Sequence, residues 1–148
     1  MILLAAVDFS EAAGAVLEQA AELARLTGAK LVLLHVARPE PDFVGYDVGP
    51  QHVRDHLAVV FVEEHRQLRA WADELKSEGI AASYRLVQGA TAETILDQAE
   101  DLKADLIVVG SHGHGAVYDL LVGSVSESLL RKTDRPVVVV PARGHPSE

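Results

Sequence analysis

The stretch DLIVVGSHGHGAVYDLLVGSVSESLL, residues 105–130, decides the fold more than any other part of the chain. It opens with a short apolar run, continues through closely spaced glycines and ends in a serine cluster. Glycine is costly unless the backbone must turn sharply or approach another group closely. The stretch therefore predicts a buried strand over 105–110, a tight turn, and a helix near 124–132.

The rest of the chain repeats this alternation of apolar runs and helical periods. Further strands are predicted at 2–7, 30–36, 80–87 and 135–141, of which 80–87 alternates in part and is expected nearest an edge. A first helix is expected from an N-cap at Ser10 to Gly28. Its inward face is Val16, Leu17, Ala20, Leu23 and Ala24.

Two more helices are predicted in the middle of the chain. One runs over 52–78 and ends at Gly79, and the other is opened by Gly89 and Thr91. The long helix carries apolar residues at helical spacing: Val53, Leu57, Val60, Phe61, Leu68, Trp71 and Leu75. The later helix turns Ile95, Leu96, Ala99 and Leu102 inward.

Strands that alternate with helices predict a single α/β domain over 1–148, with a variable loop at 37–51 and a frayed tail at 142–148. Apolar strands of this kind form a parallel sheet covered on both faces, and right-handed crossovers make it doubly wound. Such sheets bind ligands at the carboxyl ends of strands where the strand order reverses. Asp8, Val36 and Gly110 are predicted to lie there.

Composition excludes several classes of function. The chain has 148 residues, a net charge of −9 and a pI near 5.2, which argue against a nucleic-acid or anionic-membrane partner. It has no cysteine, which excludes disulfides, thiolate nucleophiles and cysteine zinc sites. The apolar run at 2–7 is too short to span a membrane and lacks a signal's basic flank, so a cytoplasmic protein is expected.

The glycines follow the spacing Gly110-x2-Gly113-x9-Gly123-Ser124, which fits neither familiar phosphate loop. A Walker A loop needs a lysine before its Ser or Thr, and a dinucleotide loop needs a third glycine where Tyr118 stands. Backbone N–H groups at a helix start still favour an anion. Tight turns with Ser124 as a helix cap explain the same residues, so both interpretations stay open.

The segment GSHGHGAVYDLLVGSVSESLL, followed by RPVVVVP, resembles the C-terminal half of universal stress proteins. Its spacing matches the G-x2-G-x9-G-[ST] motif of the ATP-binding branch without a gap. The resemblance continues at AAVDFSEAA, LVLLHV and VQGATAETIL, and thus spans the domain apart from 37–51. It implies a five-stranded parallel sheet of order 3-2-1-4-5. It also implies an ATP-binding regulator of the stress response that forms a homodimer through the strand at 137–140. The protein partners of such a regulator are unknown.

The resemblance also implies the binding residues. Asp8, with Ala6 and Val7 before it, would hold the adenosine, although an acid placed before a helix also favours the helix dipole by under ~1 kcal/mol. The backbone around Val36 would contact the base. Gly110 and Gly113 would line the path of ribose and phosphates. The phosphates would meet N–H groups and hydroxyls of Gly123, Ser124, Val125 and Ser126, with Mg²⁺ or Mn²⁺ accompanying the nucleotide.

Charge in the motif departs from the relatives, which often carry Lys or Arg between the second and third glycines. Here HGAVYDLLV holds His114 and Asp119 but no Lys or Arg, and Arg131 and Lys132 lie downstream. Phosphate charge would then be balanced by backbone, hydroxyls, a metal ion and protonated histidine. ADP or AMP is an alternative ligand to ATP.

The substitution Gly123→Val is expected to block nucleotide binding and leave the fold intact.

The remaining candidates are histidines and a possible ATPase. His52 and His56 are one turn apart and could chelate zinc, but His65 points elsewhere, so a solvated helix face is the favoured explanation of these residues. His112 and His114 lie in the loop and could touch phosphate. No nucleophile elbow or acid/base pair is found, so no catalytic residue is named. A slow ATPase or phosphotransferase, dependent on Ser124 and Asp8, and a nucleotide-free dimeric interaction module are the alternatives.

Overall fold

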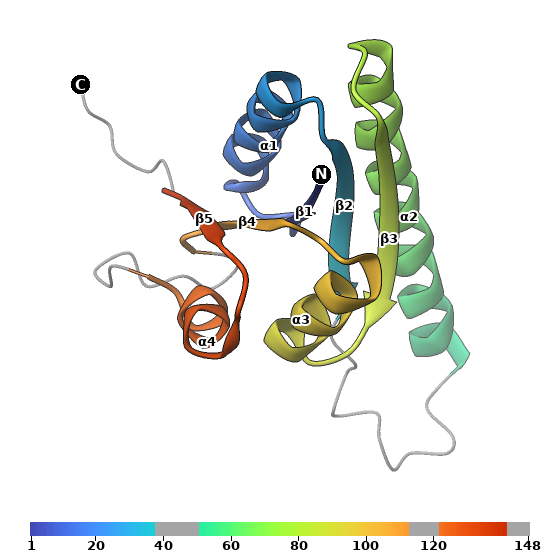
Figure 1. Ribbon diagram of the computed structural model, residues 1–148. Coiled ribbons are helices and arrows are strands. Elements are labelled where there is room, and N and C mark those ends of the chain that lie inside the picture. Colours follow the sequence, from blue (N-terminus) through green and yellow to red (C-terminus); the bar gives the residue numbers. More distant parts are fainter. Residues whose placement is uncertain (38–50, 113–121, 142–148) are drawn as a thin grey trace, which may run out of the picture.

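A computed structural model describes residues 1–37, 51–112 and 122–141, with the side chains of 51–57 left out. It contains one five-stranded parallel sheet of order β3-β2-β1-β4-β5, as predicted. The strands are β1 (Ile2–Ala6), β2 (Lys30–Ala37), β3 (Ala82–Gln88), β4 (Leu106–Gly110) and β5 (Val137–Val140). The helices are α1 (Ala13–Thr27), α2 (Gln51–Ser77), α3 (Thr91–Leu102) and α4 (Ser124–Lys132). Figure 1 shows α1 and α2 on one face of the sheet and α3 and α4 on the other.

Two hydrophobic clusters hold these layers together, one on each face of the sheet. One joins α1 and α2 to the sheet, for example through Val16, Leu68 and Leu33, and the other joins α3 and α4 through Ile95 and Leu129. β1 is apolar on both faces, with Leu3 and Leu4 both fully buried. Such two-sided burial is why the sequence shows continuous apolar runs rather than alternation. β3 lies at an edge of the sheet, as its weaker pattern indicated.

The first helix begins later than predicted. We expected Ser10 as its N-cap, but α1 begins at Ala13 with Ala12 at the N-cap position. The reason is a turn before the helix, in which the backbone N–H and the hydroxyl of Ser10 both donate to Asp8 Oδ1. The Ser10 hydroxyl also accepts the Ala12 N–H at 3.3 Å, so Ser10 closes the turn that leads into α1, two residues before the N-cap position. The helix ends at Gly28 as predicted, with φ of 71° in the left-handed region.

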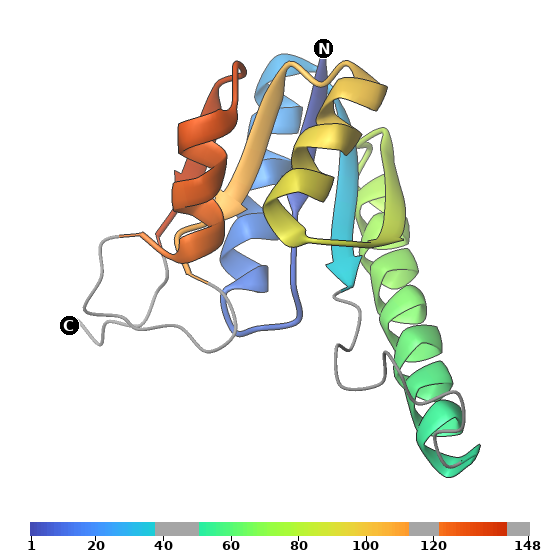
Figure 2. The same cartoon turned by 90° about the horizontal axis from the view of Figure 1, so that it is seen from below.

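Helix α2 is longer than the sheet it covers. Its 27 residues span about 40 Å, whereas the seven residues of β3 span about 23 Å. Figure 2 shows its first half projecting past the strand ends. Leu68 and Leu75 are buried as expected, but Val60 and Phe61 are about 40% exposed, since no strand lies beneath them in the described part of the chain. Val53 and Leu57 have side chains outside the described residues.

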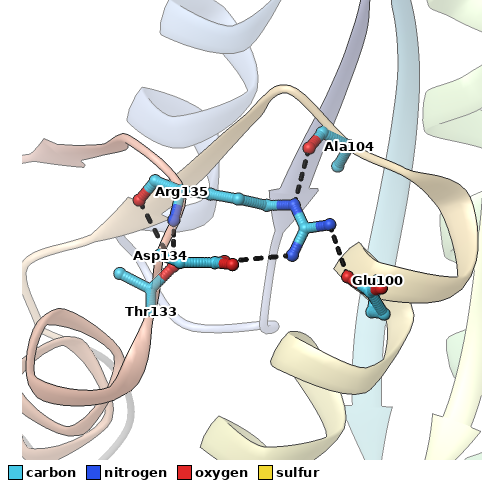
Figure 3. Close-up of polar contacts among 5 residues, drawn as sticks. All are labelled: Glu100, Ala104, Thr133, Asp134 and Arg135. Carbon is cyan, nitrogen blue, oxygen red and sulfur yellow. Dashed lines mark hydrogen bonds and ion pairs between the residues drawn. The ribbon is translucent and has the colours of Figure 1, made fainter.

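Arg135 fastens the start of β5 to the end of α3 (Figure 3). Its Nε donates to the carbonyl of Ala104 at 2.8 Å, and its other nitrogens reach Glu100 at 2.7 Å and Asp134 at 3.4 Å. The hydrogen bond from Arg135 holds the pKa of the Glu100 carboxyl below its ordinary value. This arginine clasp lies at the amino-terminal end of the sheet and fixes β5 beside β4.

Candidate functional site

The carboxyl ends of β1, β2 and β4 lie at one edge of the sheet because all five strands are parallel. The chain passes from β1 to β2 in one direction and from β4 to β5 in the other, so the strand order reverses between β1 and β4. Helices α3 and α4 begin at the same edge (Figure 2). The edge thus brings together Asp8, Val36, Gly110 and Gly123, where α/β sheets hold their ligands.

Asp8 follows β1 and is half-buried in the turn that leads to α1. Its Oδ1 accepts the Ser10 backbone N–H at 3.0 Å and the Ser10 hydroxyl at 2.5 Å. Both contacts use the same oxygen, which leaves Oδ2 as the oxygen for a ligand. Asp8 lies five positions before Ala13, the first residue of α1, so it fixes a turn and does not stand in the first turn of that helix.

The end of β2 offers backbone groups beside the place where β1 stops. The last β1–β2 pair is Ala6 with Leu34, followed by a hydrogen bond from Val7 N–H to the Leu34 carbonyl at 2.8 Å. Peptide groups alternate in direction along a strand, so Val36, two residues on, also turns its N–H and C=O toward the β1 side. Its side chain is buried. Val36 thus presents backbone groups near this edge, one residue before β2 ends at Ala37.

Glycine is required at position 123 because the backbone there packs closely against the backbone of residues 111 and 112. Its N–H donates to the Ser111 carbonyl at 2.6 Å, and a Cβ placed on it would lie 2.9 Å from that oxygen and 3.4 Å from His112 Cα. The expectation that valine at this position leaves the fold intact is therefore wrong. Gly110 is also crowded, because a Cβ there would lie 3.3 Å from a Val16 methyl of α1.

The first turn of α4 points N–H groups out of the helix. Its first internal hydrogen bond runs from Glu127 N–H to the Gly123 carbonyl at 2.9 Å, so the N–H groups of Ser124, Val125 and Ser126 precede it. No side chain of the described residues caps this end. Ser126 is 2% exposed, and its hydroxyl donates to the Gly110 carbonyl at 2.7 Å. It therefore ties α4 to β4, while Ser124 stands exposed.

A pocket of about 400 Å³ lies beside this turn. It is lined by the first residues of two helices: Gly89, Ala90, Thr91 and Ala92 before and in α3, and Ser124, Val125 and Ser128 in α4. Sequence reasoning missed the contribution of α3, because only the fold brings residues 89–92 beside 124–128. A ligand bound at the start of α4 would therefore also contact the start of α3.

The two basic side chains at the end of α4 are engaged by acids. Lys132 Nζ lies 3.0 Å from Glu93 of α3, and Arg131 lies 2.8 Å from Glu127 in its own helix. The hydrogen bond from Lys132 holds the pKa of Glu93 below its ordinary value. Neither cation is directed to the first turn of α4, so the site relies on backbone donors and the helix dipole.

Some predicted residues cannot be compared with the structure. Gly113, His114 and Asp119 lie outside the described residues, as do the side chains of His52 and His56. Among the described residues no cluster of three His, Cys, Asp or Glu could hold a metal ion. Within the same ranges no helix is both long and apolar enough to cross a membrane. His112 is placed against Gly123, and its Nδ1 lies 2.9 Å from the Ser111 hydroxyl.

Comparisons with known proteins agree with this architecture. A family model described as "Universal stress protein family" matches residues 1–141. The "Universal stress protein in QAH/OAS sulfhydrylase 3'region" of Thermus aquaticus is 34% identical over 139 residues, covering 93% of this chain and 96% of that one. Universal stress protein YxiE of Bacillus subtilis is 30% identical over 143 residues, covering 93% and 97%. The solved structure of protein MJ0577 of Methanocaldococcus jannaschii superposes with a TM-score of 0.81 at 29% identity, covering 97% of each chain.

Proposed function

This chain belongs to the universal stress protein family, and from that premise we propose that it binds an adenine nucleotide, with ATP the expected ligand, as a regulator in stress response. The observation that carries the proposal is the first turn of α4. Its N–H groups lie at the edge where the strand order reverses, beside a pocket lined by the starts of α3 and α4. An anion with an attached base fits such an arrangement.

Each part of the nucleotide has a place in this proposal. The base meets the Val36 backbone, and Asp8, held in its turn by Ser10, binds the adenosine through Oδ2 beside Ala6 and Val7. The phosphates meet the N–H groups of Ser124, Val125 and Ser126, and Gly123 allows their close approach, since its own N–H is already donated to the Ser111 carbonyl. Ser124 also offers its hydroxyl, whereas the Ser126 hydroxyl is already used by Gly110. Gly110 and Gly113 line the path between them.

Mg²⁺ or Mn²⁺ would supply positive charge that the described side chains of the site lack. The exposed donors of α4 suit phosphate oxygens, but Lys132 and Arg131 are paired with Glu93 and Glu127. A metal ion bound to the phosphates would lower their net charge where protein cations do not. We therefore expect ATP to bind more weakly without the metal, and the difference to be smaller for AMP.

Two similar structures support an adenine nucleotide. A universal stress protein in complex with cAMP has a TM-score of 0.71 with this chain at 23% identity, covering 97% of this chain and 98% of that one. The universal stress protein from Archaeoglobus fulgidus in complex with dAMP has a TM-score of 0.66 at 24% identity, covering 95% and 97%. Both ligands share the adenine base and a phosphate, which are the groups that the proposed site recognises.

Isothermal titration tests the proposal with ATP, ADP and AMP, each with and without Mg²⁺. We expect one binding site per chain, with the highest affinity for one of these three nucleotides. GTP is the control, because a site specific for adenine rejects it. Mass spectrometry of ligand released from the purified protein provides an independent measurement. No binding at millimolar nucleotide and no released adenine compound would refute nucleotide binding and leave a nucleotide-free interaction module.

We also propose a homodimer formed through β5. This strand pairs with β4 and lies at the edge of the sheet, and its sequence is four consecutive valines. Val137, Val138 and Val139 are only partly buried. An apolar edge strand is a template for pairing with another chain, and a second copy offers the same surface. Light scattering at the mass of two chains supports this proposal, whereas the mass of one chain contradicts it.

A further inference from the structure

His35 is a buried histidine beneath the proposed site, and sequence reasoning did not single it out. It lies in β2, directly before Val36, and is 8% exposed. Its ring faces α2 and the turn after β1, on the side of the sheet opposite α3 and α4. The ring packs against Phe9 with centroids 4.6 Å apart, and Phe9 stacks on Trp71 of α2 at 5.4 Å.

Both ring nitrogens of His35 face acceptors. Nδ1 lies 3.0 Å from the Val7 carbonyl, and Nε2 lies 3.3 Å from a carboxylate oxygen of Glu64. A carbonyl has no proton to give, so the Nδ1 contact needs an N–H on that nitrogen. The Nε2–Glu64 contact is an ion pair, which requires a charged ring. A neutral imidazole can make the first contact, but only the imidazolium combines it with attraction to the Glu64 carboxylate. The geometry therefore favours a charged ring paired with Glu64.

The contacts connect three elements at one point. Val7 follows β1 and directly precedes Asp8 in the turn, His35 belongs to β2, and Glu64 belongs to α2. Glu64 and Trp71 are seven residues apart, two turns along the same helix face. The ring thus links the turn after β1 to α2, and no other described hydrogen bond joins that turn to α2.

We propose that His35 is a positioning residue whose protonated ring ties the turn carrying Asp8 to α2, so that nucleotide affinity falls as the ring loses its proton. The affinity part of this inference rests on the proposed function. The protonated ring itself does not, because it follows from the contacts of the protein alone. In this proposal His35 does not contact the nucleotide and acts through Val7 and Asp8.

The sign of the pH effect follows from which form of the ring makes both contacts. The charged ring makes both of them and the neutral ring loses the ion pair with Glu64, so raising the pH weakens the tie. The charged and titratable groups near the ring among the described residues are Glu64 and His65 on α2, Asp8 on the turn, and Tyr84 on β3. Tyr84 hydroxyl and His65 Nε2 lie 3.3 Å from each other, so that pair is engaged separately.

Nuclear magnetic resonance of the nucleotide-free protein tests the protonated ring. Correlation of ring nitrogens with their protons at about pH 6 is expected to show an N–H on both nitrogens of His35. In Glu64→Gln the neutral amide can donate to Nε2, so the ring should carry one N–H, on Nδ1. A wild-type ring with a single N–H at this pH would overturn the inference, whether or not nucleotide binds.

Titration of Mg²⁺–ATP at about pH 6 and pH 8 tests the effect on affinity. Phosphate also titrates in this range, so variants are compared at the same pH. The wild type should lose about fivefold more affinity than Glu64→Gln between the two values, because an ion pair is lost only in the wild type. His65→Gln is the matched control and should behave as wild type. Equal losses in wild type and Glu64→Gln would overturn the positioning role.

Two substitutions of His35 separate positioning from general packing. Asn at position 35 retains an amide donor near Nδ1 for the Val7 carbonyl, whereas Leu fills the space without a donor. His35→Asn should therefore bind at least about tenfold more tightly than His35→Leu at matched thermal stability. Equal affinities would contradict the role of the Val7 contact. If wild type binds no nucleotide, the proposed function fails, and the resonance experiment still decides the state of the ring.

Discussion

Replacing Ser124 with aspartate should strengthen the fold and weaken nucleotide binding at the same time. Ser124 is the first residue of α4, is exposed, and follows an N-cap without a side-chain hydrogen bond. A carboxylate in the first turn interacts favourably with the helix dipole by about 0.3–1 kcal/mol. In a chain of 148 residues this corresponds to a rise in Tm of roughly 1–4 °C.

The same carboxylate would stand where the proposal puts a phosphate. Two unit charges 4 Å apart repel by about 1 kcal/mol in water and about 4 kcal/mol near a protein surface. Ser124 is exposed, so the smaller figure is nearer, and a phosphate with more than one charge brings the penalty to about 1.4 kcal/mol or more. That corresponds to an affinity at least about tenfold lower.

Asparagine is the matched control, because it has the shape of aspartate without the charge. Thermal unfolding and calorimetric titration of Mg²⁺–ATP are measured for Ser124→Asp, Ser124→Asn and wild type. The reasoning predicts that only the aspartate variant combines a higher Tm with the tenfold loss. Equal affinities of the two variants would show that the phosphates do not lie at the start of α4. A lower Tm for aspartate would refute the argument from the dipole.

Three further predictions concern the framework around the site. Gly123→Ala should lower the free energy of unfolding by about 1–3 kcal/mol in urea denaturation, because its Cβ would lie 2.9 Å from the Ser111 carbonyl; an unchanged stability would show that this turn yields freely. Glu100→Gln should make the Tm less sensitive to acid. The pKa of Glu100 is lowered in the folded protein, so its carboxylate stabilises the fold above the unfolded pKa, and this contribution is lost as the pH falls through the folded pKa. Parallel profiles of Tm against pH for variant and wild type would contradict the role of the arginine clasp. Val139→Pro should convert the proposed dimer into a folded monomer in light scattering, because the Val140 carbonyl faces β4 and the alternating peptide group of Val139 faces outward; a persistent dimer would place the interface elsewhere.

Most of the architecture could be predicted from sequence because burial on both faces leaves an unmistakable pattern. The continuous apolar run before Asp8 and the one before Gly110 mark strands that helices cover on both sides. The start of α1 could not be predicted in this way. Ser10 has the residue type of a cap, but its N–H and hydroxyl donate to Asp8 and its hydroxyl accepts from Ala12, which together form a turn before the helix. These local side-chain contacts place the start of the helix three residues after Ser10.

The roles of single polar side chains depended on contacts that are distant in sequence. Ser126 and Ser124 look alike in the motif, yet α4 packs on β4 so that one hydroxyl is buried on Gly110 and the other faces outward. His35 stands in the apolar run LVLLHV, and its partner Glu64 is 29 residues away. A polar residue inside a buried strand is the only signal that the sequence offered for it. Its partners had to come from the fold.

The hydrogen bond from Gly123 to Ser111 has a consequence for how this protein can be altered. It joins the residues on either side of the stretch 112–122 at 2.6 Å and so holds the end of β4 against the start of α4. The closure cost of a loop between two fixed points changes slowly with its length, by about 0.6 kcal/mol for each doubling. A change in the number of residues between Ser111 and Gly123 is therefore expected to cost the fold little closure entropy.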